Sequence, residues 1–130
     1  MGLNIASRAT ELLKLLESLR TSSEDIKDIL IADHQGLTLV STFDDVEKEA
    51  RLSAMTAMVI NNSVRALEEM EFGRLTNVVI TGQQGYLFIR QIGPEVGIAL
   101  SLKPGAAWSS LIPKINWVIM KILSIKEGDS

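Results

Sequence analysis

A long apolar-rich segment in the middle of the chain constrains the fold more than any other feature. Three carboxylates stand at its start, and Asp44 as N-cap with Glu47 three residues later makes a capping box. We therefore predict a helix from Val46 to Phe72, about 40 Å long at 1.5 Å per residue. Gly73 follows as the residue expected to end the helix.

This predicted helix has more apolar positions than one stripe needs. One face suits packing on a sheet and consists of Leu52, Val59, Ile60, Leu67 and Met70. A second, adjacent face consists of Ala54, Met55, Met58, Asn62 and Ala66. A single sheet covers only one of these faces, so the second requires another partner. We predict Met70 in the core, and Met55 and Met58 at an interface.

The remaining segments predict an αββαβββα order in one domain, residues 1–130, with a core of about 5–126. A first helix is predicted over residues 4–20 and a last one up to about Lys126. The predicted strands are Ile26–Ala32, Leu37–Thr42, Leu75–Thr81, Tyr86–Arg90 and Val96–Leu102. Short turns join most of them, which favours an α/β (α+β) fold with a mainly antiparallel five-stranded sheet between helix layers.

Local patterns refine this prediction. The run Ile29–Ala32 is apolar without alternation, so we expect a strand covered on both faces. In the last strand Gly97, Ala99 and Ser101 share one side, and their small size would let a helix pack close to the sheet. Pro113 predicts either a kink in the last helix or a late start.

Composition excludes several classes of function. The formal net charge is −3, which gives no electrostatic reason to expect nucleic acid or an anionic membrane. There is no Cys and only one His, so zinc motifs and a cysteine nucleophile are excluded. No apolar stretch approaches the length that spans a bilayer, and the N-terminus lacks a secretory pattern. We therefore expect a cytoplasmic protein without membrane insertion.

The individual motifs do not support catalysis, a cofactor or a metal. Gly82 and Gly85 lack the Lys-Ser/Thr of a phosphate loop and fit a hairpin turn. His34 stands on a predicted turn, Asp33–Gly36, without a second acid-base group. The carboxylates around Asp45 lack metal-loop spacing and are explained by helix capping. We therefore predict a binding module rather than an enzyme.

The order of elements and two turns carry a family resemblance. The Asp33-x-x-Gly36-Leu37 hairpin and the strand pair Val78-Val79-Ile80-x(4)-Gly85-x-Leu87-x-Ile89 resemble the roadblock (dynein light chain) family, in its single-domain prokaryotic form. The resemblance implies that the second helix covers one sheet face and the first and last helices cover the other. It also implies a dimer in which the second helix and the third strand meet their counterparts, extending the sheet, and a Ras-like small GTPase as partner.

These expectations assign residues to two surfaces. The predicted homodimer interface consists of Ala54, Met55, Met58, Asn62, Ala66, Leu75, Asn77 and Val79. The GTPase-binding candidates, on the polar rim of the paired helices, are Lys48, Arg51, Arg65 and Glu69. The function expected is therefore that of a non-catalytic scaffold. The alternative is a small-molecule sensor of the GAF or PAS kind, which would need a cavity between sheet and helix.

Overall fold

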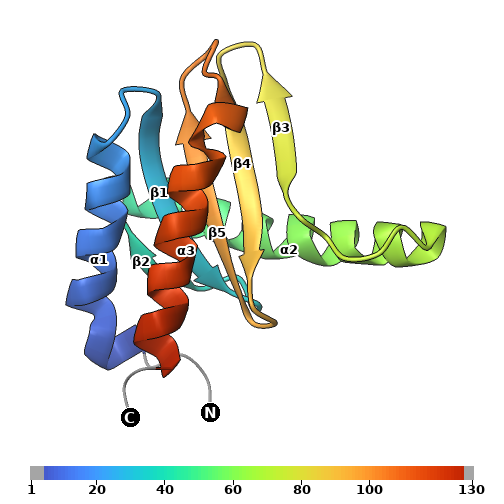
Figure 1. Cartoon of the computed structure of the whole chain (residues 1–130), viewed down its shortest axis with the longest axis horizontal. Coiled ribbons are helices and arrows are strands. Elements are labelled where there is room, and N and C mark those ends of the chain that lie inside the picture. Colours follow the sequence, from blue (N-terminus) through green and yellow to red (C-terminus); the bar gives the residue numbers. More distant parts are fainter. Residues whose placement is uncertain (1–4, 128–130) are drawn as a thin grey trace.

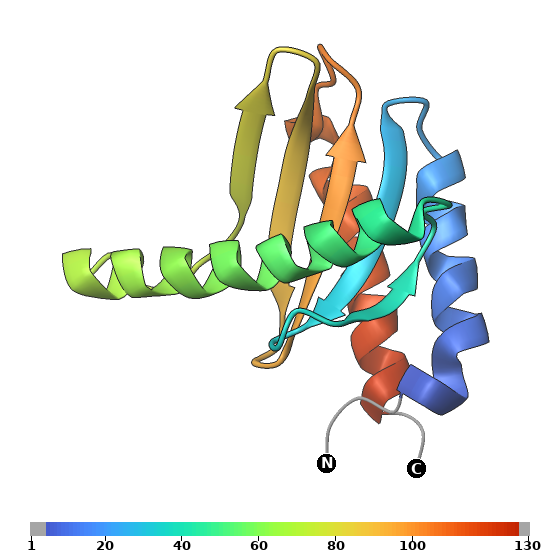
Figure 2. The same ribbon diagram turned by 180° about the vertical axis from the view of Figure 1, so that it is seen from behind.

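The chain folds into a five-stranded sheet with helices on both faces. The structure is a computed structural model that describes residues 5–127. Its elements are α1 (Ile5–Thr21), β1 (Ile26–Asp33), β2 (Thr38–Ser41), α2 (Val46–Met70), β3 (Val78–Gly82), β4 (Gly85–Ile92), β5 (Val96–Leu102), a 3₁₀ turn (Trp108–Leu111) and α3 (Ile112–Glu127). Helices α1 and α3 lie on one face, and α2 crosses the other (Figures 1 and 2). The predicted αββαβββα order is confirmed.

All neighbouring strands of the sheet are antiparallel. Their spatial order is β2-β1-β5-β4-β3, so β5 is central and β2 and β3 are the edges. The register aligns Leu30 with Ala99, and Ala99 with Ile89, across the three middle strands. These three side chains face α2, and the alternate positions face α1 and α3.

The larger core lies between the sheet and the α1–α3 layer. Its fully buried members include Leu12, Leu16, Ile29, Ile31, Phe88, Ile98, Leu100, Ile115 and Ile122. The Phe88 and Trp108 rings close one end, with centroids 6.1 Å apart and planes tilted by 41°. Such contact between aromatic rings adds to the burial energy of each.

A smaller core lies between the sheet and α2. Ile29–Ala32 is buried throughout, as predicted for a strand covered on both faces. Gly97 sets the spacing: a Cβ atom placed there would lie 2.4 Å from Ile60 Cδ1 and 3.6 Å from Thr56 Cγ2. The small face of β5 therefore does let the helix approach, as its sequence indicated.

The β1–β2 hairpin is shaped by its turn residues. Asp33 Oδ1 accepts hydrogen bonds from the backbone N–H groups of Gln35 (2.9 Å) and Leu37 (3.0 Å). Gly36 has φ +91°, and a Cβ there would lie 3.0 Å from Ala54 Cα. Both a positive φ and close contact with α2 require glycine at this position.

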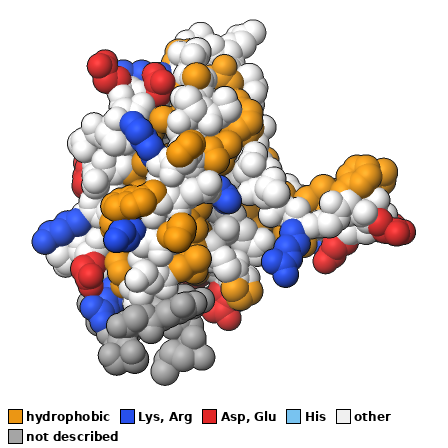
Figure 3. Space-filling view, in the orientation of Figure 1, with side chains coloured by type: hydrophobic (Ala, Val, Ile, Leu, Met, Phe, Trp, Pro, Cys, Tyr) orange, Lys and Arg blue, Asp and Glu red, His pale blue; other side chains and the backbone are white. Residues whose placement is uncertain are grey.

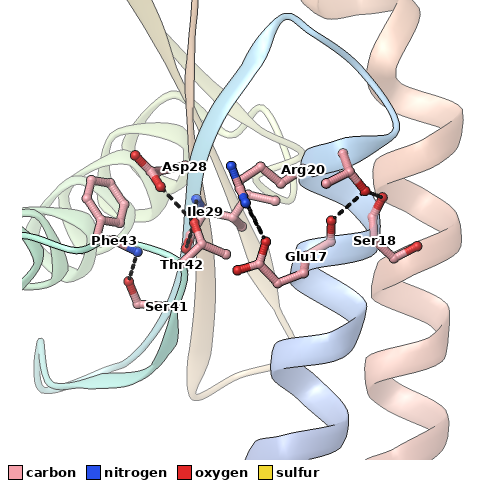
Figure 4. A network of polar contacts seen from close by, with 9 residues as sticks. Glu17, Ser18, Arg20, Asp28, Ile29, Ser41, Thr42 and Phe43 are labelled. Carbon is pink, nitrogen blue, oxygen red and sulfur yellow. Dashed lines mark hydrogen bonds and ion pairs between the residues drawn. The ribbon is translucent and has the colours of Figure 1, made fainter.

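A polar network fastens the edge strand β2 to β1 (Figure 4). Thr42 Oγ1 donates to Asp28 Oδ1 (2.9 Å) and accepts from the Ile29 N–H (3.0 Å). The Phe43 N–H donates to Ser41 Oγ (2.8 Å). The chain is thereby directed from the sheet into the start of α2.

Helix α2 begins at Val46 as predicted, but its N-cap residue and its C-terminal end differ from the prediction. The N-cap is Asp45, whose Oδ1 accepts from the Lys48 N–H at 3.0 Å, and not Asp44. Two adjacent aspartates are chemically equivalent in sequence, and only the backbone path distinguishes them. The helix ends at Met70, and Glu71, with φ 57°, takes the left-handed position expected of Gly73.

Two further boundaries are corrected or decided by the structure. Strand β3 begins at Val78 rather than Leu75. For Pro113, the late helix start is observed: a 3₁₀ turn occupies Trp108–Leu111, and Pro113 is the second residue of α3. In the first turn a missing N–H costs no helical hydrogen bond, so proline is tolerated there.

Candidate functional site

Helix α2 is longer than the sheet that it covers. Its 25 residues span about 37 Å, and its C-terminal end projects past the edge strand β3 (Figure 2). Its buried side chains, Leu52, Ser53, Thr56, Ala57 and Ile60, all lie in the N-terminal two-thirds. The end that projects therefore has no sheet of its own chain beneath it.

The buried polar groups of α2 are satisfied within the chain. Ser53 and Thr38 are hydrogen-bonded through their hydroxyl groups, and Thr56 Oγ1 donates to the Leu52 carbonyl at 2.7 Å. Among the described residues, no buried side-chain nitrogen or oxygen lacks a partner. The buried polar groups on this side of the helix therefore need no ligand as a hydrogen-bond partner.

The opposite side of α2 exposes the predicted interface residues. Met55 is 50% exposed and Met58 is 60% exposed, and Ala54, Asn62 and Ala66 are also exposed. The sequence thus identified the uncovered face. Met70 was predicted to be core and is 59% exposed. That prediction is wrong because the helix has already passed the edge of the sheet at Met70.

The four charged candidates belong to the same face as the methionines. All are exposed, and alternating steps of three and four residues connect Lys48, Arg51, Met55, Met58, Asn62, Arg65 and Glu69. Such spacing places side chains along one stripe of a helix. We call these seven residues the α2 stripe. Its ends are charged, its middle holds the two methionines and Asn62, and the two predicted surfaces are not spatially separate.

The strand residues of the predicted interface occupy different positions. Leu75 and Asn77 precede β3 and are half-buried; Leu75 packs with the α2-side core. Val79 lies in β3 and packs on the opposite, α1–α3 side. The residues therefore do not form one face of a strand. What they share is their nearness to an edge: β3 pairs with β4 alone among the described strands.

Sequence reasoning missed three exposed apolar side chains around this region. Phe72 is 69% exposed just beyond α2, Val46 is 73% exposed at the helix start, and Ile80 is 42% exposed on the edge strand. Phe72 stands three residues after Glu69, and this helical spacing in the sequence was a usable signal, although the left-handed Glu71 ends the helix before Phe72. Ile80 gave no such signal, because the neighbouring strand residues are equally apolar.

Two hollows border α2. One, lined by residues such as Thr56, Ile60 and Gly97, encloses about 20 Å³ between helix and sheet. Small-molecule sites usually have 300–1,000 Å³, so this space suits a single water. The other, about 670 Å³ and open, lies under the projecting end and is lined in part by Val64, Leu75 and Pro94. The space between the sheet and the part of α2 that covers it is therefore too small for a small-molecule ligand.

The described part of the chain holds few groups that could bind a metal ion or act in catalysis. Residues 5–127 hold no group of three or more His, Asp or Glu side chains placed to bind a metal ion. His34 is exposed on the β1–β2 turn. None of the helices described is long and apolar enough to cross a membrane. The main candidate for a binding surface is therefore the α2 stripe, which lies beside the unpaired edge of strand β3.

Comparison with known proteins agrees with this architecture. The family model described as "Roadblock/LC7 domain" matches residues 12–101. MglB from Myxococcus xanthus superposes with a TM-score of 0.82 at 14% identity, over 92% of this chain and 90% of that chain. No curated protein sequence matches the chain.

Two other solved structures share the fold. The gliding protein MglB from Thermus thermophilus gives a TM-score of 0.79 at 13% identity, over 94% of this chain and 93% of that chain. A Roadblock/LC7 domain from Streptomyces avermitilis gives 0.80 at 14% identity, over 85% and 92%. At such identities the likeness concerns the fold.

Proposed function

The chain belongs to the Roadblock/LC7 domain family, and from this membership we propose that it is a non-catalytic homodimeric scaffold that binds a Ras-like small GTPase. The observation that carries the proposal is the α2 stripe beside the unpaired edge of β3. Exposed methionines and an open strand edge are both features that soluble proteins usually cover. A second copy covers both at once, because a two-fold axis brings each feature to its own counterpart.

The charges of the α2 stripe favour antiparallel pairing of the two helices. Lys48 and Arg51 stand at one end and Glu69 at the other. An antiparallel arrangement with the two-fold axis between Met58 and Asn62 sets Arg51 of each copy opposite Glu69 of the other. Parallel pairing would instead oppose like charges, which is unfavourable. In the antiparallel dimer the two Met58 side chains lie beside the axis and each Met55 lies opposite Arg65 of the other copy. Strand β3 extends the sheet by pairing with its counterpart.

The GTPase is proposed to bind the outer surface of the paired helices. The candidates Lys48, Arg51, Arg65 and Glu69 are all exposed in the single chain. Arg51 and Glu69 also suit the pairing between copies, and in this register Arg65 lies opposite Met55 of the other copy. Lys48 therefore becomes the better candidate for the GTPase. The proposal places the protein in the cytoplasm with its partner, in agreement with a chain that has no Cys.

Titration calorimetry with purified Ras-like GTPases from the same cell tests the partner. We expect binding to one GTPase, with affinities that differ between its GDP form and the form bound to a GTP analogue. The variant Lys48→Glu should weaken this binding about tenfold or more, since the loss of an interface anchor costs about 2 kcal/mol or more. Lys103→Glu, with the same change of charge away from α2, is the control. Failure of every GTPase to bind in either state contradicts the proposed partner.

The alternative of a small-molecule sensor is not favoured, because the hollow of about 670 Å³ under the projecting end of α2 is open rather than enclosed. It requires a ligand cavity between helix and sheet, and the space there is about 20 Å³. Gly97 and Ile60 fill the position that such a cavity would occupy.

A further inference from the structure

A groove runs between α1 and α3, on the sheet face opposite α2. The two helices are antiparallel and lie side by side (Figure 1). Two hollows of about 340 and 390 Å³ meet at Trp117, which lines both. We call this the α1–α3 groove and define it by Lys14, Leu15, Ser18, Trp117, Lys121 and Ile125.

The groove has the dimensions of a short helical segment. Its α3 wall runs from Pro113 to Ile125, which is about 18 Å at 1.5 Å per residue. Three turns of a helix have the same length. The space-filling view shows hydrophobic side chains gathered over α1 and α3, with Lys and Arg side chains among them (Figure 3).

Trp117 is the natural anchor of this surface. It is 53% exposed, and Met120, one turn further along α3, is 70% exposed. Lys121 Nζ lies 5.2 Å from the centre of the Trp117 ring. A large aromatic side chain held in the middle of a groove is typical of the residues that dominate binding energy at interfaces.

The charge of the groove is positive although the chain as a whole is negative. Lys14, Lys114 and Lys121 line it, and none of them forms an ion pair with another described residue. Lys114 Nζ donates only to the Ser22 carbonyl, at 2.8 Å. The lysine charges are therefore available to a partner.

Glu11 also lines the groove, beside Lys14, and both Glu11 and Glu17 are paired with arginines on the same helix. Glu11 pairs with Arg8 at 2.9 Å, and Glu17 pairs with Arg20 at 2.7 Å. The hydrogen bond and charge of Glu17 raise the pKa of Arg20 above its ordinary value, so Arg20 keeps its charge at any working pH. The acidic side chains of α1 thus do not cancel the lysines.

We propose that the α1–α3 groove binds an acidic amphipathic helix of another protein, with an apolar side chain of that helix packed on Trp117. The three lysines favour acidic residues at the flanks of the bound helix, and the apolar side chains of the groove favour an apolar stripe on that helix. The groove lies on the sheet face opposite the α2 stripe, so it stays open in the dimer proposed above. A concave channel also suits a helix better than the flat surface of a bilayer.

Peptide selection on the purified chain tests this inference and does not require an identified partner. A phage library of random 16-residue peptides is selected on the native protein, with excess Trp117→Ser protein as competitor. We expect enriched peptides with Asp or Glu flanking Leu, Phe or Trp at three- and four-residue spacing. In fluorescence anisotropy, Trp117→Ser and Lys14→Glu/Lys121→Glu should each weaken their binding about tenfold or more.

Matched controls separate the groove from general charge and from membranes. Lys27→Glu/Lys103→Glu carries the same charge change outside the groove and should bind the peptides normally. The inference is overturned if no peptide is enriched, if the enriched peptides are neutral or basic, or if both groove variants bind them like the native protein. Co-sedimentation with phosphatidylcholine–phosphatidylserine vesicles that depends on Lys14 and Lys121, without such peptides, would overturn it in favour of a lipid surface.

Discussion

At the scale of single residues, Gly97 determines how closely α2 approaches the sheet. A methyl group there would lie 2.4 Å from Ile60 Cδ1, far inside a normal contact. Alanine also restricts the unfolded chain, which stabilises by about 0.4–1 kcal/mol. Overpacking costs about 1–3 kcal/mol, and the end of the Ile60 side chain, which is 7% exposed, would have to move away from the new methyl group. The packing term should therefore exceed the entropic one.

We predict that Gly97→Ala lowers the free energy of unfolding by about 1–2 kcal/mol, measured by urea denaturation. Ile60→Val removes the atom that clashes. In the Ile60→Val background, Gly97→Ala should therefore cost much less stability than it does in the native protein. Equal costs of Gly97→Ala in the two backgrounds would show that Ile60 is not the obstacle.

Single residues also mark where sequence reasoning succeeded and where it could not. The Asp33–Gly36 turn was predictable because Asp commonly accepts such backbone hydrogen bonds in turns and Gly readily takes the positive φ. The choice between Asp44 and Asp45 as N-cap was not, because both can accept the same hydrogen bond. The left-handed Glu71 was also unpredictable, since Gly73 stood nearby as the better candidate.

At the scale of elements, α2 is a helix that leaves large apolar side chains exposed to solvent. Its apolar positions were recognised from their spacing, but the sequence does not reveal the width of the sheet. Met70 was therefore assigned to the core, although the helix projects past β3 at that point. Leu75 was assigned to a strand for the same reason, although β3 begins three residues later, at Val78.

The proposed antiparallel pairing of α2 predicts a specific rescue by charge reversal. Arg51→Glu and Glu69→Arg should each weaken the dimer, because each sets like charges opposite one another. The double variant restores opposite charges and should recover most of the dimer affinity. Sedimentation equilibrium measures all three constants. Two single losses that simply add in the double variant would exclude this register.

The unpaired edge of β3 makes a second prediction at this scale. If β3 pairs with its counterpart, its outward backbone N–H groups become hydrogen-bonded and exchange slowly. Hydrogen exchange followed by mass spectrometry should show slower exchange over Val78–Gly82 in the native protein than in Met58→Glu. The opposite edge strand β2 should exchange equally in both. Fast exchange of β3 in a proven dimer would mean that the sheets are not joined.

At the scale of the whole molecule, the order of the elements could be predicted from local patterns, whereas the placement of the helices on the two sheet faces was implied by the family resemblance. Turn chemistry, strand alternation and helix periodicity agreed with one another, and so did the small side chains of β5 that receive α2. The binding surfaces could be predicted less well. The α1–α3 groove arises only when residues about 100 positions apart, such as Lys14 and Lys121, are brought together because α1 and α3 pack on the same face of the sheet.

Both interaction surfaces follow from this layered arrangement. The sheet separates the α2 stripe, proposed to bind a second copy, from the α1–α3 groove, proposed to bind an acidic helix. The two surfaces can therefore be occupied at the same time. A scaffold that holds one partner against another needs this separation.

The oligomeric state of the purified chain, measured by sedimentation velocity from low to high micromolar concentration, tests the central claim most directly. Full burial of a methionine side chain stabilises by roughly 1.5–3 kcal/mol, whereas burial of an unpaired charge is strongly unfavourable. We predict a dimer for the native protein and for Met120→Glu, a matched change on α3, and a folded monomer for Met58→Glu. A native chain that stays monomeric at high concentration, or a Met58→Glu variant that dimerises normally, would contradict the account.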